Sequence, residues 1–177
     1  MNVAFNIAGG IAVVATLLAI TRSNAVHALL YLVVSLLAVA LDFLLLGAAF
    51  VAALEVIIYA GAIVVLFVFV VMMLNLGPEA EAVEQRWLTP RLWLGPTILA
   101  GLLILEIDYL LTHSGLTAFA GSAAAGPHEV GLTLFGPYLI GVELASMLLL
   151  AGLVGAYHVG RQVTAAKEGR DGVGSAH

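Results

Sequence analysis

Apolar residues dominate five long stretches of the chain, and short polar or glycine-rich connections separate these stretches. A helix needs about 20 mainly apolar residues to cross the hydrocarbon core of a bilayer. Each of the five stretches reaches about this length. The pattern therefore predicts an all-α integral membrane protein with five transmembrane helices, at roughly 2–20, 27–46, 51–76, 92–111 and 135–158.

The same pattern divides the chain into two parts. We expect residues 1–160 to form a five-span membrane domain and residues 161–177 to form a charged cytoplasmic tail. The first stretch has no basic residue before Arg22 and is followed by further spans, so we expect a retained helix and not a signal peptide. Gly95-Pro96 and Gly136-Pro137 each precede an apolar stretch, which suits a proline in the first turn of a helix.

Composition supports lipid as the main surroundings. Hydrophobic residues make up 63% of the 177 positions and charged residues 10%, a balance that a soluble domain of this size could not bury. The chain has no cysteine, which excludes disulfides, thiolate metal sites and cysteine-ligated iron-sulfur clusters. Any redox chemistry must therefore take place in another chain. Six Lys and Arg residues without a cluster argue against nucleic-acid binding.

Basic residues indicate the direction of the chain in the membrane, because Lys and Arg are retained on the cytoplasmic side. They occur only after the first stretch, between the third and fourth, and after the fifth. The six positions are Arg22, Arg86, Arg91, Arg161, Lys167 and Arg170. We therefore predict that the amino terminus lies outside the cytoplasm and that the carboxyl terminus lies inside it.

Five acidic residues fall inside the predicted spans, and each costs roughly 2.5 to 3.5 kcal/mol at the centre of a span. With the predicted direction all five lie in the outer half of the membrane: Asp42, Glu55, Glu106, Asp108 and Glu143. Asp42 and Asp108 suit an interfacial position, whereas Glu55 and Glu106 fit an interfacial or a buried one. Glu143 lies about 12 Å along its helix and is the hardest to explain as interfacial.

No basic residue lies inside any predicted span, so none of these acids has an ionic partner within the membrane part of the chain. Each must be protonated, hydrated or paired with another subunit. A carboxyl group without a partner in apolar surroundings can take up and release protons near neutral pH, which a proton relay requires. This chemistry suits proton transfer but does not specify it.

The stretch LEVIIYAGAIVV, residues 54–65, opens the third span with unusual features. Glu55, Tyr59 and Ala62 recur at steps of three and four, which places them on one face of an α-helix. Gly61 falls on another face, in a turn of small side chains. Such a turn can widen from i−4 to i−5 hydrogen bonding, a π-bulge that concentrates at functional sites, or it can allow close packing of another helix.

Three stretches resemble the subunit J family of bacterial proton-translocating NADH-quinone oxidoreductase, respiratory complex I. They are NAVHALLYLVVSLL, LEVIIYAGAIVVLFVFVVMMLNLG and GLTLFGPYLIGVELASMLLLAGLVGAYHVGR. The resemblance implies a multi-pass, non-redox subunit of this translocase in the bacterial inner membrane, beside subunits A, H, K and N. It also implies that FMN, iron-sulfur clusters, NADH and quinone are bound in other subunits, with no cofactor or metal in this chain.

The resemblance further implies that the third helix can form a π-bulge, relax to regular α-helix and so gate a proton path. The positions that match the family motif are Glu55, Tyr59, Gly61, Val65, Phe67 and Glu143. Asp42, Glu106 and Asp108 depart from the family pattern, so we treat them as weaker candidates.

Two other functions remain open at the level of the residues. The chain could be a small ion carrier or a subunit of a multisubunit cation/proton antiporter, with Glu55 and Glu143 as its own binding site. It could also be a purely structural assembly subunit whose acids are incidental.

Overall fold

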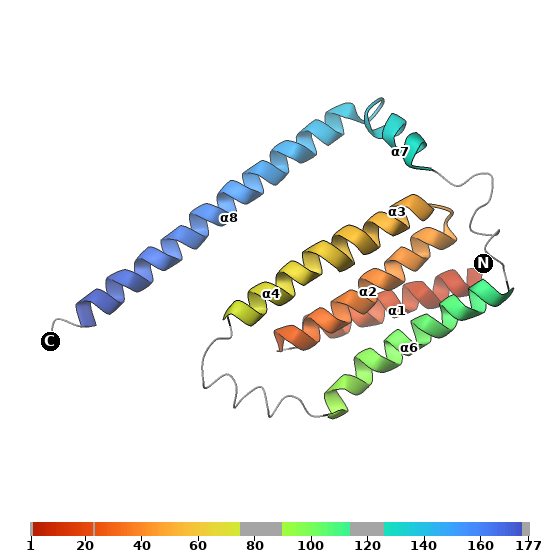
Figure 1. Cartoon of the computed structure of the whole chain (residues 1–177), viewed down its shortest axis with the longest axis horizontal. Helices are drawn as coiled ribbons and strands as arrows, with labels where there is room; N and C mark the ends of the chain where they lie inside the picture. The colour runs from red at the N-terminus through yellow and green to blue at the C-terminus, as the bar shows by residue number, and fades with distance from the viewer. Residues whose placement is uncertain (1, 23, 75–89, 114–125, 175–177) are drawn as a thin grey trace. The chain divides into compact units, whose positions relative to one another are not determined.

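The computed structural model is helical throughout the residues that it describes, which are 2–22, 24–74, 90–113 and 126–174. The chain forms two compact units, Met1–Gly126 and Pro127–His177, and each is described by itself. The first unit contains α1 (Asn2–Thr21), α2 (Ala25–Leu45), α3 (Ala49–Leu54), η1 (Glu55–Ile63), α4 (Val64–Leu74) and α6 (Pro90–His113) (Figure 1). The second contains α7 (Pro127–Leu134) and α8 (Leu139–Gly174).

Among the described residues, five helices are long and apolar enough to cross a membrane, which confirms the predicted all-α, five-span fold class. The candidate spans are Val3–Thr21, Ala25–Leu45, Ala49–Met73, Trp93–His113 and Leu139–Arg161. The third of these spans is built from α3, η1 and α4 in succession. The direction across the membrane stays a prediction, and Arg86, one of the residues on which it rests, lies outside the described residues.

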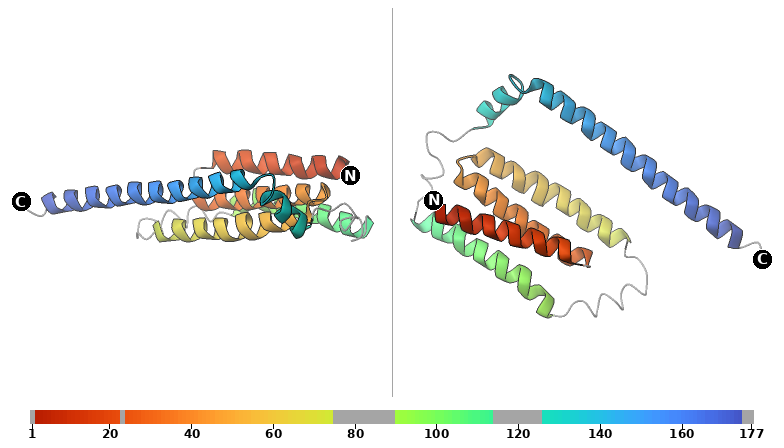
Figure 2. Two further views of the ribbon diagram at one scale, coloured as in Figure 1. Left: turned by 90° about the horizontal axis from the view of Figure 1, so that it is seen from above. Right: turned by 180° about the vertical axis from the view of Figure 1, so that it is seen from behind.

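Close packing of small side chains joins α1 to α2. Ala8 and Ala15 on α1 and Ala38 on α2 are fully buried, and the absence of larger side chains lets the two backbones approach each other. A short polar contact completes this interface, because the Oγ of Ser35 donates a hydrogen bond of 3.0 Å to the carbonyl of Ala12. Helices α1, α2 and α6 lie side by side, and the third span runs along α2 (Figures 1 and 2).

Both ends of α2 are closed by local sequence signals. Asn24 caps the start, since its side-chain Oδ1 accepts hydrogen bonds from the backbone N–H groups of Val26 at 2.8 Å and His27 at 3.2 Å. Gly47 follows the last turn with φ of 81°, a left-handed conformation that glycine adopts without steric cost. The N–H of Ala48 then bonds to the carbonyl of Phe43, so α2 turns sharply into α3.

Three predicted details of the helix boundaries are wrong. Helix α6 begins at Pro90 and carries Pro96 inside it, so Pro90, and not Pro96, is the proline of the first turn. Pro137 lies in a turn, two residues before α8 begins at Leu139. Part of the connection that was predicted between the fourth and fifth spans forms α7. Helix α8 continues through the predicted tail as far as Gly174, and the division into membrane domain and cytoplasmic tail stays a prediction.

We predict that Gly95→Ala destabilises the first unit. A Cβ at this position would overlap the hydroxyl of Tyr31, and overpacking of this kind costs about 1–3 kcal/mol. The thermal midpoint of the purified complex and its yield should both fall. Tyr31→Phe removes the hydroxyl and should restore part of the loss in the double variant; equal losses in the single and double variants would contradict the overlap.

Candidate functional site

The backbone of the third span changes its hydrogen bonding over nine residues. At Glu55 the N–H still bonds to the carbonyls of Val51 and Ala52, within the range of an α-helix. From Glu55 to Ile63 the chain is a π-helix, and at its end the N–H of Val64 bonds to the carbonyls of Gly61, three residues back, and Tyr59, five residues back. π-Helical segments are rare and occur frequently at functional sites.

Small side chains surround the π-helical turn. Ala60, Gly61 and Ala62 follow one another, and a Cβ added to Gly61 would lie 3.1 Å from the carbonyl oxygen of Val56. Val56 is the residue five positions before Gly61, which is the π-helical acceptor position. A side chain at residue 61 would therefore press on this carbonyl group, which would have to shift by a few tenths of an ångström.

The π-helix also sets which side chains face α2. Within Ala49–Met73 the two buried residues are Ala52, 7% exposed, and Val64, 3% exposed, and each part of this span packs along α2. In a regular α-helix, at about 100° per residue, positions twelve apart point about 120° away from each other. The widened segment absorbs about one residue and so brings Ala52 and Val64 back to the same side.

The predicted polar face of the third span needs a correction for the same reason. It assumed α-helical spacing from Glu55 through Ala62 and onward, and that spacing does not hold between Glu55 and Ile63. Glu55 is half-buried, whereas Tyr59 is 52% exposed. Val65 and Phe67 are exposed on α4. These motif residues therefore all lie on the third span. Glu55 and Tyr59 are within the π-helix, and Val65 and Phe67 follow it.

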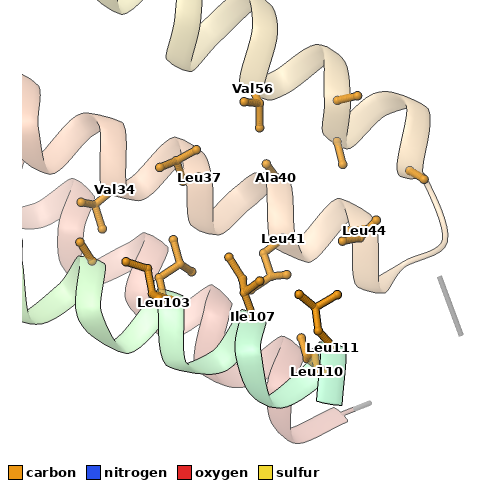
Figure 3. Close-up of a pocket in the computed structure, with 15 residues that line it drawn as sticks. Val34, Leu37, Ala40, Leu41, Leu44, Val56, Leu103, Ile107, Leu110 and Leu111 are labelled. Atoms are coloured by element: carbon orange, nitrogen blue, oxygen red, sulfur yellow. The ribbon is translucent and has the colours of Figure 1, made fainter. Parts of the chain in front are cut away.

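An apolar cavity of about 460 Å³ lies beside the start of the π-helix, between α2, the third span and α6 (Figure 3). Val56 points into it from η1, facing Ala40 of α2, and Leu103 and Ile107 line it from α6. The labelled side chains that line the cavity carry only carbon atoms. The third span thus has free space along part of its inner side.

The acidic residues separate into three environments. Glu106 on α6 is buried, 8% exposed, and lies near the partly buried Asp42 of α2. Asp108, two residues further along α6, is exposed. Glu143 is exposed on α8 in the second unit, so the structure does not place it relative to Glu55. Within the described residues, no group of three or more His, Asp or Glu side chains is arranged to hold a metal ion.

Comparison with known proteins places this chain in a family. The family model for NADH-ubiquinone/plastoquinone oxidoreductase chain 6 matches residues 15–159. NADH-quinone oxidoreductase subunit J of Pseudomonas aeruginosa is 57% identical over 162 residues, which cover 92% of this chain and 98% of that protein. Subunit J of Escherichia coli is 56% identical over 165 residues, covering 92% and 88%. Subunit J of Buchnera aphidicola from Schizaphis graminum is 49% identical over 152 residues, covering 86% and 93%.

The chain belongs to this family. It is a membrane subunit of NADH-quinone oxidoreductase, an enzyme complex, and other subunits of that complex are its partners. The resemblance found in the three sequence stretches is thereby confirmed.

Reasoning from the sequence missed two features of this subunit. It did not single out Ala52 and Val64, although their twelve-residue separation is a signal once a widened turn is assumed. It also did not bring Asp42 and Glu106 together, because the partners of α2 and α6 cannot be read from either helix alone.

We predict that deletion of Ala62 preserves assembly of the complex. Without this residue, a regular α-helix would separate Ala52 and Val64 by eleven positions, about 20° from a whole number of turns, so both would still face α2. The yield of purified complex containing the variant subunit measures this outcome.

The matched control is deletion of Val13, an exposed residue in the regular helix α1. It turns Ala15 away from α2 by about 100° and should abolish assembly. Equal loss of complex in the two deletion variants would contradict this interpretation, because it would show that η1 does not contain one residue more than a regular α-helix needs over the same span.

Proposed function

We propose that this chain is the non-redox subunit that couples quinone reduction to proton translocation in NADH-quinone oxidoreductase. The π-helix Glu55–Ile63, within a stretch that resembles the family motif, is the observation that carries the proposal. It acts as a two-state gate in the third helix. Chemistry in neighbouring subunits shifts the balance between its π-helical and α-helical forms.

The geometry of η1 supports two states. Relaxation to α-helix would release about one residue, so α4 would rotate by about 100° relative to α3. Glu55 is the first residue of the π-helix and would keep its direction, whereas Val65 and Phe67 follow the π-helix and would turn. Rotation of these bulky side chains can open or close a hydrated path for protons along the third span. Glu143 is a further carboxyl candidate for that path.

Two features keep the cost of such a change low. The small side chains at Ala60 and Ala62 do not interlock with a neighbouring turn, and Gly61 leaves the carbonyl of Val56 free to approach. The cavity beside Val56 gives that side chain space to move without displacing α2 or α6. A gate needs two packings that differ by only a few kcal/mol, and a span packed tightly on all sides would not allow this.

The remaining functional assignments follow from the family and from the chain's own residues. With no cysteine in its sequence, the subunit is proposed to leave FMN, iron-sulfur clusters, NADH and quinone to other subunits. Subunits A, H, K and N are the proposed neighbours. The proposed location is the bacterial inner membrane, with the amino terminus outside the cytoplasm, on the basis of the Lys and Arg positions.

We predict that substitution of Gly61 impairs coupling and leaves electron entry intact. Alanine would press on the carbonyl of Val56 in the π-helical form, and it also favours α-helix over glycine by about 0.5–1 kcal/mol. The balance should then shift toward the α-helical form by up to about fivefold. Valine should have a larger effect. Quinone reduction and proton pumping should fall, while NADH oxidation with ferricyanide as acceptor stays unchanged.

Gly101→Val on α6 is the matched control, because a Cβ there meets no atom within 4 Å. The Ala62 deletion provides a second test, since it removes the widened turn and should give an assembled complex with impaired coupling. Full pumping by an assembled complex that carries Gly61→Val would contradict the gate. Loss of assembly with Gly61→Val but not Gly101→Val would favour a purely structural role for this turn.

A further inference from the structure

Two acidic side chains lie near each other inside the first unit, away from the π-helix. Asp42 lies in the last turn of α2, and Glu106 lies seven residues before the end of α6. Helix α1 packs against both helices, and at this level it presents Gly9, where an added Cβ would lie 3.5 Å from Oδ2 of Asp42. The two carboxyl groups lie near enough for their charges to interact.

Neither carboxyl group has its hydrogen-bonding needs met. Glu106 is 8% exposed, and both of its buried Oε atoms lack a hydrogen-bond partner among the described residues. The buried Oδ1 of Asp42 also lacks one in this part of the chain. Buried polar atoms are almost always paired in proteins, so three unpaired oxygens at one place indicate that the site binds something else.

The surrounding helices offer no positive charge to balance the pair. Val3–Thr21 of α1 has no ionisable side chain, and Ala25–Leu45 and Trp93–His113 contain no Lys or Arg. His27 and Tyr31 of α2 lie toward the opposite end of that helix, at least about 16 Å away along its axis. On α6, Asp108 and Tyr109 are exposed, and His113 stacks on the ring of Tyr109.

We infer that Asp42 and Glu106 form a proton-binding site in which the two carboxyl groups share one proton. Two neighbouring carboxylates in apolar surroundings cannot both stay ionised without a cation, because burial and mutual repulsion both disfavour the second charge. The more buried Glu106 holds the proton, and the partly buried Asp42 keeps the negative charge. The bound species is a single proton that is taken up from water, so the pair carries one negative charge.

A metal cation fits this site less well than a proton. Calcium takes six to eight oxygen ligands and magnesium needs octahedral coordination, whereas this site offers two carboxyl groups. No third His, Asp or Glu joins them within the described residues. The proton site depends on the packing of α1, α2 and α6 and not on the π-helix, so it stands whether or not the proposed gate operates.

Infrared difference spectroscopy on the purified complex tests this inference. The spectrum of the wild-type complex minus that of the Asp42→Asn, Glu106→Gln double variant should contain one protonated-carboxyl band and one carboxylate band at neutral pH. The carboxyl band should shift when water is replaced by deuterium oxide. If the amide variant does not assemble, a double variant with leucine at both positions replaces it, because apolar side chains fill a similar buried volume without a charge.

Asp108→Asn is the matched control, since this exposed acid lies on the same helix and should contribute no protonated band. Loss of the protonated band in this control would overturn the assignment to the pair. Two carboxylate bands in the difference spectrum would also overturn the inference, because both acids would then be ionised and paired with a cation or a neighbouring subunit. Loss of the protonated band when sodium chloride replaces choline chloride at fixed pH would show metal-ion binding instead.

Discussion

Burial of two side chains on the third span, which packs along α2, is the constraint on which the rest of this subunit depends. Ala52 and Val64 are the buried side chains of that span, and a regular α-helix could not direct both toward α2. The chain meets the constraint by widening the turns between Glu55 and Ile63. The π-helix is therefore a consequence of packing. Because this packing forms in only one register of the third span, a change of register would also change the packing.

That coupling between packing and register is what suits the segment to a gate. Helix α4 is tied to α3 through a turn whose side chains are too small to lock it, and a cavity lies beside Val56. Interfaces of this kind switch between discrete arrangements and do not deform continuously. In the proposed function, a small change in a neighbouring subunit produces a large rotation within this one.

Five acidic residues of this subunit lie in candidate membrane spans, where a charged side chain is costly. Glu55 is half-buried at the start of the π-helix, whereas Glu106 and Asp42 meet between α1, α2 and α6. No Lys or Arg lies within the candidate spans to neutralise them, apart from Arg161 at the end of the fifth. Groups that are costly to ionise in such surroundings can exchange protons, which is the property that the proposed function requires of them.

Much of this fold could be predicted from the sequence, because hydrophobic length alone determines which segments can cross a bilayer. The five spans and the family were predicted correctly. The start of α6 was not, since Pro90 and Pro96 carry the same local signal and only the helix itself decides between them. Long-range packing was also out of reach, so neither the pairing of Asp42 with Glu106 nor the orientation of Val64 followed from local spacing.

The most direct test of the gate is a pair of density maps of the whole complex, one at rest and one during turnover. Hydrogen bonding from Glu55 to Leu66 should follow i−5 spacing in one state and i−4 spacing in the other. Val65 and Phe67 should rotate by about 100° between the two states, while Ala52 keeps its contact with α2. The same π-helical bonding in both states of a pumping enzyme would contradict the account.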